Sequence, residues 1–552
     1  MDSVTDVSSV DKNIRKGTKV SSTFWFPLWK TISLLAILHL VAFDFLILAV
    51  PEIIQVQYTP DDGYYYLALA RNFIRFGEWT FDGGMSLTSG FHLMQAYLLA
   101  AVYRLFQPSP ENFVRLGLSM SAVVTMIVVL LAWRLCLRKK DTLFLIVFTI
   151  LITAKSFLLN SISITEWPLV ILIAGLYCAY FYEERSEREN LLIPFGLGLL
   201  GSLARSDFGL LPFSIFIATL FVALQMKRVS LIRAASAGLV GAVFGIGLIF
   251  VHNFITTNTF LQSSALMKSY WAQFGRQQFY SAATLGLQAL GMDLSIADFK
   301  RSTFLLTVFA ISGPVLLILL AKISGQNNLP PAIFKLDPNR PIHERVLVLA
   351  AALCLAGYTI LYTLSGTMQS WYTANLIWPI FILLVGGARY LDKRILEEYQ
   401  FILIWLSVFA VTSIGIQILS LYPLGEKTSP LPHQQFMLEA GRYLQQNPVD
   451  GYVGSWNAGI TGYYQGGIGV INIDGLVNND IYPYAVQNKL PAYLRAKNIH
   501  YIIDFENMFY QPFPKRGGYE DADFLAHLIP IKTFDQGEFI EFKFLRLYRI
   551  GP

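Results

Sequence analysis

The sequence predicts a polytopic α-helical membrane protein that ends in a soluble α/β domain. Hydrophobic residues make up 54% of its 552 residues and charged residues only 14%, whereas a soluble protein would carry about a quarter charged residues. Apolar runs of about twenty residues, long enough to cross a bilayer as a helix, recur along the chain. They stop near residue 420, beyond which the sequence is much more polar.

The first apolar run, 31–51, follows a polar segment of mixed charge. We expect residues 1–30 to be a disordered tail that its lysines and arginines keep in the cytoplasm. Run 31–51 is too long for the core of a signal peptide, so we expect it to stay as a membrane span. The other predicted spans are 114–133, 142–160, 166–182, 191–204, 207–226, 233–252, 302–322, 345–364, 371–388 and 399–420.

The apolar run 91–107 decides the predicted topology. Loops that contain lysine or arginine are typically cytoplasmic. The chain has five such charged loops, and all five fall on the same side of the membrane only if run 91–107 does not cross it. We therefore expect about eleven transmembrane helices within residues 31–420. Two large loops, 52–113 and 253–301, then lie outside the cytoplasm, together with the domain 421–552.

Polar and charged residues gather on the external side of this topology. The charge rule did not require them to lie together, so their common position indicates a functional site. They are Asp61, Asp62, His92, Glu166, Arg205, Asp207, Lys268, Trp371 and Tyr372.

The adjacent carboxylates of Asp61 and Asp62 allow two interpretations. In the structural one, Thr59 is the N-cap and Pro60 the first residue of a helix to about residue 76, and the carboxylates complement the positive helix end. In the functional one, the same pair takes a proton from a hydroxyl or helps to hold a divalent cation such as Mg²⁺ or Mn²⁺. The sequence does not require a metal.

Three tyrosines, Tyr64, Tyr65 and Tyr66, follow the acidic pair, and Trp79 comes a little later. Aromatic rings at this depth are typical anchors at the membrane interface. Stacking on a sugar is the alternative role.

The remaining candidates also have a structural and a functional interpretation. His92 is either a hydrogen-bonded structural residue or a phosphate contact, and Glu166 either caps a span or faces the site. Arg205 and Asp207 interrupt an apolar stretch, where a charge must be paired or hydrated, so they form an ion pair or line an external cavity. Lys268 lies in a loop long enough to suggest function, either as a solvated lysine or as a phosphate clamp.

The domain 421–552 has the alternation of short apolar strands and turns that is typical of α/β proteins. Strands are predicted at 451–456, 470–474, 501–505 and 542–550, and a helix at 483–497. The three cysteines lie in or beside apolar runs, in no zinc-type spacing. A net charge of +5 is small for this length and does not indicate a nucleic-acid partner.

Five short motifs stand out along the chain: Asp61–Tyr66, Thr80–Gly83, Ser89–His92, Gly454–Gly459 and Asn472–Asn478. They resemble motifs of the GT-C superfamily, the glycosyltransferases that use polyprenyl-phosphate sugars. The nearest likeness is to bacterial relatives of protein O-mannosyltransferases and to the aminoarabinose transferase of lipid A.

The resemblance implies the GT-C fold and a direct, inverting transfer of a sugar from a polyprenyl phosphate to a hydroxyl of a glycan, lipid or protein. By position in the motifs, Asp61 matches the catalytic acid/base and Asp62 its acidic neighbour. Lys268, Arg205 and His92 would contact the donor phosphate. Substrate contacts are also expected at Glu166, Asp207, Tyr65, Trp371 and Tyr372. The same likeness favours a bacterial inner membrane, with the site and the last domain in the periplasm.

Two other classes of protein share these features. A transporter or flippase of lipid-linked sugars would share the spans and the buried charges. It would differ in placing those charges near the bilayer midplane and in consisting of two related halves. A non-catalytic assembly or sensor protein would bind glycan through its outer domain.

Overall fold

The computed structural model describes most of the chain. The described residues are 22–183, 190–226, 229–274, 285, 288, 341–365, 369–390, 400–422, 429–509, 515–535 and 542–551. The predicted span 302–322 lies outside them.

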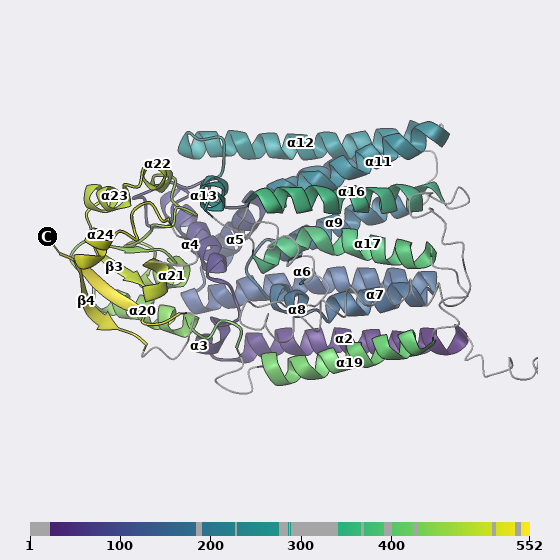
Figure 1. Cartoon of the computed structure of the whole chain (residues 1–552), viewed down its shortest axis with the longest axis horizontal. Helices are drawn as coiled ribbons and strands as arrows, with labels where there is room; N and C mark the ends of the chain where they lie inside the picture. Colours follow the sequence, from purple (N-terminus) through teal and green to yellow (C-terminus); the bar gives the residue numbers. More distant parts are fainter. Residues whose placement is uncertain are drawn as a thin grey trace, which may run out of the picture.

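A bundle of long, roughly parallel helices forms the larger part of the molecule (Figure 1). Each predicted span within the described residues coincides with a helix or, for 142–160, with a pair of helices bent by 68°. The helices are α2 (Ser22–Ala49), α6 (Pro110–Lys139), α7 (Thr142–Ile152), α8 (Lys155–Ser161), α9 (Trp167–Tyr182), α10 (Leu192–Ala204), α11 (Leu210–Met226), α12 (Val229–Thr257), α16 (Ile342–Ser365), α17 (Ala374–Tyr390) and α19 (Gln400–Leu421).

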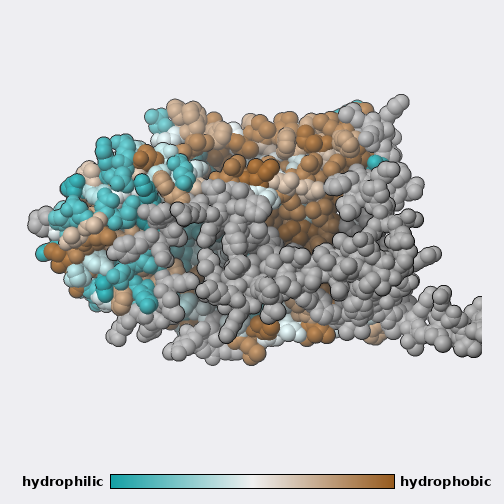
Figure 2. All heavy atoms as spheres, in the orientation of Figure 1, coloured by the Kyte–Doolittle hydropathy of each residue, from teal (hydrophilic) through white to brown (hydrophobic). Residues whose placement is uncertain are grey.

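The bundle has the surface of a membrane protein. Within the described residues, α2, α6, α12 and α16 are each long and apolar enough to cross a bilayer, and the pair α7 and α8 would make a fifth span. Where described residues of the bundle are visible, they are mostly hydrophobic, whereas hydrophilic residues gather on the C-terminal domain at the left (Figure 2). The chain is therefore an integral membrane protein.

Shorter elements lie between the bundle and the last domain (Figure 1). Helix α5 corresponds to the apolar run 91–107, which we expected not to cross the membrane. It packs against α4 at this end of the bundle. The elements are α3 (Glu52–Gln55), α4 (Asp61–Phe76), α5 (Leu93–Phe106), η1 (Ser206–Gly209), α13 (Ser263–Ala272) and η3 (Ser370–Thr373).

The C-terminal domain is built on a five-stranded sheet in the order β2-β1-β3-β5-β4. Strands β2, β1 and β3 are parallel, and β5 and β4 continue the sheet in antiparallel pairs. The strands are β1 (Tyr452–Ser455), β2 (Val470–Asn472), β3 (Ile499–Asp504), β4 (Leu528–Thr533) and β5 (Arg546–Ile550). The helices are α20 (Gln434–Gln446), α21 (Gly459–Gln465), α22 (Ile481–Val486), α23 (Leu490–Ala496), η4 (Glu506–Phe509) and α24 (Ala522–Ala526).

Four local predictions were wrong. Residues 22–30, expected to belong to a disordered tail, form the first turns of helix α2, while residues 1–21 lie outside the described ranges. The helix expected at 483–497 is two short helices, because Asn488 adopts a left-handed conformation (φ 57°) between them. Strand β4 was missed, since its exposed residues include Pro530, which is typical of an edge strand. The N-cap of α4 is Pro60 rather than Thr59.

Helices α10 and α12 approach closely because glycines face the partner backbone, as small residues do between membrane helices. A Cβ atom on Gly241 would overlap the backbone carbonyl oxygen of Phe195. Gly247, on the same helix, has no neighbouring atom within 4 Å of such a Cβ.

We predict that Gly241→Ala destabilises the bundle by about 1–3 kcal/mol, since the backbones must separate. The matched control Gly247→Ala should be neutral or slightly stabilising, because alanine favours helix more than glycine does. Thermal unfolding of the purified proteins in detergent measures both. Equal melting temperatures for the two variants would contradict this packing.

Candidate functional site

The acidic pair lies at the start of α4, where the helix meets the C-terminal domain. Both carboxylate oxygens of Asp61 accept backbone hydrogen bonds from α21: Gly459 N at 3.0 Å and Ile460 N at 2.7 Å. Burial raises the pKa of Asp61 to about 7, although these two donors favour the charged form. A Cβ on Gly459 would collide with Asp61, so only glycine fits here.

Asp62 has a different environment from its neighbour. Within the described part of the chain, no side-chain or backbone donor is hydrogen-bonded to its carboxylate. Burial raises the pKa of Asp62, and the charge of Lys268 opposes that rise. Asp62 therefore has free lone pairs and a nearby cation.

Lys268 reaches the site from α13. Its Nζ donates a hydrogen bond of 2.6 Å to the Tyr372 hydroxyl and lies 5.1 Å from the centre of that ring. Burial lowers the pKa of Lys268, but Tyr372 and Asp62 outweigh this, so the net shift is upward and the amine stays charged. The corner Trp371–Tyr372 in η3 thus holds the cation beside the acidic pair.

Asp62 and Lys268 line a common cavity, here called the Lys268 cavity, with about 50 Å³ of free space. Several predicted site residues surround it, although they come from distant parts of the sequence. Those lining it are Asp62, Tyr65, Tyr66, His92, Glu166, Lys268, Trp371 and Tyr372.

Arg205 and Asp207 are structural partners in a buried ion cluster. Arg205 makes two hydrogen bonds to Asp207, of 2.8 and 3.1 Å, and one of 2.5 Å to Glu166. The hydroxyl of Tyr362 and the amide of Asn375 donate to Asp207 as well. Neither Arg205 nor Asp207 lines the Lys268 cavity, so of the two interpretations the geometry favours the ion pair.

His92 lies at the edge of this cluster. Its Nε2 is 3.5 Å from a Glu166 oxygen, and its buried Nδ1 has no partner among the described residues. Burial lowers the pKa of His92, against the charge of Glu166, so the ring is mainly neutral at pH 7. A neutral imidazole here can donate one hydrogen bond to a ligand.

The tyrosines and Trp79 are not interface anchors, contrary to the default expectation. All are at least 93% buried, and Trp79 stacks on Phe73 with ring centres 4.2 Å apart. The Tyr65 hydroxyl accepts from Ala458 N at 3.2 Å and is 3.4 Å from a carboxylate oxygen of Asp474. Tyr64 and Tyr65 thus belong to the contact between α4 and the C-terminal domain, whereas the Tyr66 hydroxyl donates to Glu166 of the bundle.

A second cavity, here called the His433 cavity, adjoins the acidic pair from the other side. It holds about 280 Å³ and is lined by Asp61, Asp62 and Trp371, together with residues of the C-terminal domain. Sequence reasoning missed the domain residues His433, Gln434, Met437, Asn457 and Phe542. The motif Gly454–Gly459, which contains Asn457, was the available signal.

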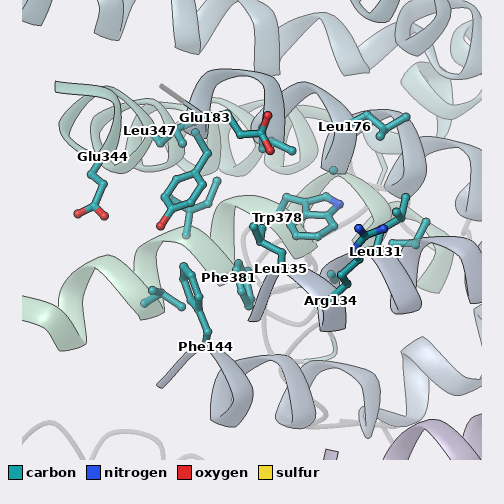
Figure 3. A pocket seen from close by; sticks show the side chains of 18 of the residues that line it. Leu131, Arg134, Leu135, Phe144, Leu176, Glu183, Glu344, Leu347, Trp378 and Phe381 are labelled. Atoms are coloured by element: carbon teal, nitrogen blue, oxygen red, sulfur yellow. The ribbon is translucent and has the colours of Figure 1, made fainter. Parts of the chain in front are cut away.

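A third cavity, of about 360 Å³, lies among α6, α9, α16 and α17 and reaches Arg134 and Glu183 near the helix ends far from the C-terminal domain (Figure 3). Apolar side chains such as Leu131, Trp378 and Phe381 form most of its wall. It contains none of the predicted site residues. In the described ranges, no three His, Cys, Asp or Glu residues are grouped so that they would hold a metal ion.

The bundle and its capping domain define the class: an integral membrane protein of the GT-C fold. The apo structure of ArnT from Cupriavidus metallidurans shares this fold, with a TM-score of 0.51 and 12% identity over 93% of this chain and 97% of that chain. A structure of ArnT from the same organism bound to undecaprenyl phosphate matches with a TM-score of 0.47 and 12% identity, over 96% of this chain and 98% of that chain. Residues 429–546 match a domain of unknown function (DUF8728). No curated protein matches the sequence.

We predict that Arg205→Met destabilises the protein by about 3–5 kcal/mol, because Glu166 and Asp207 would remain buried without their cation. The control Arg75→Met removes an exposed arginine and should have little effect. Thermal unfolding in detergent measures both changes. If Arg205→Met unfolds at the same temperature as the wild type, the ion cluster does not stabilise the protein.

Proposed function

We propose that the protein is a glycosyltransferase that moves a sugar from a polyprenyl phosphate to an acceptor hydroxyl, with inversion at the anomeric carbon. The observation that carries this proposal is the unbonded carboxylate of Asp62 in the same cavity as the half-buried cation of Lys268, at the end of an apolar bundle. A base and a phosphate-binding cation, close to a lipid surface, are what this reaction needs.

In this mechanism the acceptor oxygen attacks the anomeric carbon while its proton passes to Asp62. The bond between that carbon and the phosphate oxygen breaks, and its electron pair stays on the phosphate. Lys268 stabilises the growing negative charge, and His92 donates a hydrogen bond to it. We propose that no divalent cation is required, so that transfer continues in the presence of EDTA.

The resemblance assigned the base to Asp61, whereas we propose Asp62. Both oxygens of Asp61 are engaged by backbone amides, while Asp62 lies between the two cavities. Asp61 then positions its neighbour by fixing the start of α4 against the C-terminal domain.

The lipid half of the donor explains why a transferase should be a membrane protein. ArnT, whose apo structure shares this fold, has also been crystallised with undecaprenyl phosphate. We propose that the prenyl chain lies along the apolar helices and that its phosphate enters the Lys268 cavity. We propose that the site faces the non-cytoplasmic side, as the charge distribution of the loops predicts. The resemblance to bacterial glycosyltransferases favours the periplasm of an inner membrane.

We predict that Asp62→Asn lowers the rate of sugar transfer by about 100-fold or more, the usual contribution of a general base. Asp61→Asn should retain transfer at a reduced rate, with weaker docking of the C-terminal domain. The exposed control Asp523→Asn should match the wild type. The assay is transfer from a panel of polyprenyl-phosphate sugars by the purified protein in nanodiscs.

Two results would contradict this assignment. Unchanged transfer by folded Asp62→Asn would exclude Asp62 as the base. A wild-type protein that transfers none of the sugars, but moves the lipid across the bilayer, would be a flippase.

The pH dependence of transfer tests the pairing of Asp62 with Lys268. The lysine charge lowers the pKa of Asp62, so Lys268→Met should raise it. Less of the carboxylate is then ionised at a given acidic pH, and the acid limb of the rate profile should move to higher pH. The exposed control Lys489→Met should leave the limb in place. An unmoved limb in Lys268→Met would show that the two groups do not interact.

A further inference from the structure

The His433 cavity lies between the membrane bundle and the C-terminal domain, and both contribute to its wall. The bundle side provides Tyr58, Asp61, Asp62 and the corner Gln369–Trp371. Asp62 and Trp371 also line the Lys268 cavity. The two cavities therefore meet at the carboxylate that we propose as the base.

Ring faces and amide groups give this cavity the character of a sugar site. Tyr58, Trp371 and Phe542 contribute rings, and His433 stacks on Phe542 with ring centres 3.8 Å apart and planes 8° apart. The half-buried Asn457 and the exposed Gln369 add side chains that both donate and accept hydrogen bonds. A hydroxyl-rich ring needs this combination of apolar faces and paired donors and acceptors.

The charges around this cavity disfavour an anion. Among its described lining residues there is no lysine or arginine, and the only carboxyl groups are those of Asp61 and Asp62. Burial lowers the pKa of His433 to about 4, so its ring is neutral at pH 7. A phosphorylated or carboxylated ligand in this cavity would meet these carboxyl groups, with no cation among the described lining residues to compensate.

The size of the cavity also limits the ligand. About 280 Å³ is near the lower end of the range of small-molecule pockets, which begins at about 300 Å³. A terminal sugar unit suits this space better than an extended peptide or the body of a lipid.

We propose that the His433 cavity is the acceptor subsite and that it binds an uncharged sugar unit whose hydroxyl faces Asp62. This inference rests on the proposed function, because it assigns the second substrate of the same reaction. The C-terminal domain is then a substrate-binding part of the enzyme, through Asn457 and Phe542.

Ligand-observed NMR on the full-length protein in nanodiscs tests this subsite. The probes are methyl glycosides of neutral sugars, their 6-phosphates, a serine-containing peptide and, separately, a polyprenyl phosphate. At least one neutral glycoside should bind, and Asn457→Ala and Phe542→Ala should each weaken it about tenfold. The exposed control Asn447→Ala should not, and all three variants should bind the polyprenyl phosphate normally, which also shows that they are folded.

Three outcomes would overturn the inference. If no neutral glycoside binds while the polyprenyl phosphate does, the acceptor subsite is wrong and the proposed function survives. If the peptide or a 6-phosphate binds instead, and the two variants weaken it, the class of acceptor is wrong. If the wild type binds a glycoside but no polyprenyl phosphate, the proposed function fails, and the acceptor role fails with it.

Discussion

The contact between Asp61 and the backbone amides at the start of α21 is the interaction on which the rest of the site depends. It joins the first residues after a membrane span to a domain almost 400 positions later in the sequence. It uses both oxygens of one carboxylate, whereas the adjacent carboxylate of Asp62 has no hydrogen-bond donor among the described residues. The same contact therefore docks the domain and separates a structural acid from a reactive one.

The two cations near this contact, Arg205 and Lys268, differ in how far their charges are compensated by neighbouring groups. Arg205 donates its hydrogen bonds to Glu166 and Asp207 and lies over the Tyr372 ring, 4.1 Å from its centre, so its charge is compensated within the cluster. Among the described residues, Lys268 donates one hydrogen bond, to the neutral Tyr372 hydroxyl, and it lines the cavity beside Asp62. A half-buried cation whose hydrogen-bond partner is neutral is suited to bind an incoming anion.

Much of the fold followed from the sequence, because apolar run length and strand alternation are local signals. The spans within the described residues and four of the five strands lie where they were predicted. The site was harder, since its geometry depends on which side chains meet. The sequence brought Asp62, Lys268 and Trp371 to one membrane face, but no local pattern could indicate that Asp61 is capped by Gly459 and Ile460. For the same reason, His433 and Phe542 gave no signal: their role depends on how the domain docks.

The most direct measurement is a structure of the full-length protein with a bound polyprenyl phosphate. The account predicts a phosphate oxygen within about 3 Å of the Lys268 amine, with Asp62 on the side facing the His433 cavity. A phosphate bound elsewhere, for example beside Arg134 at the far end of the bundle, would contradict the account.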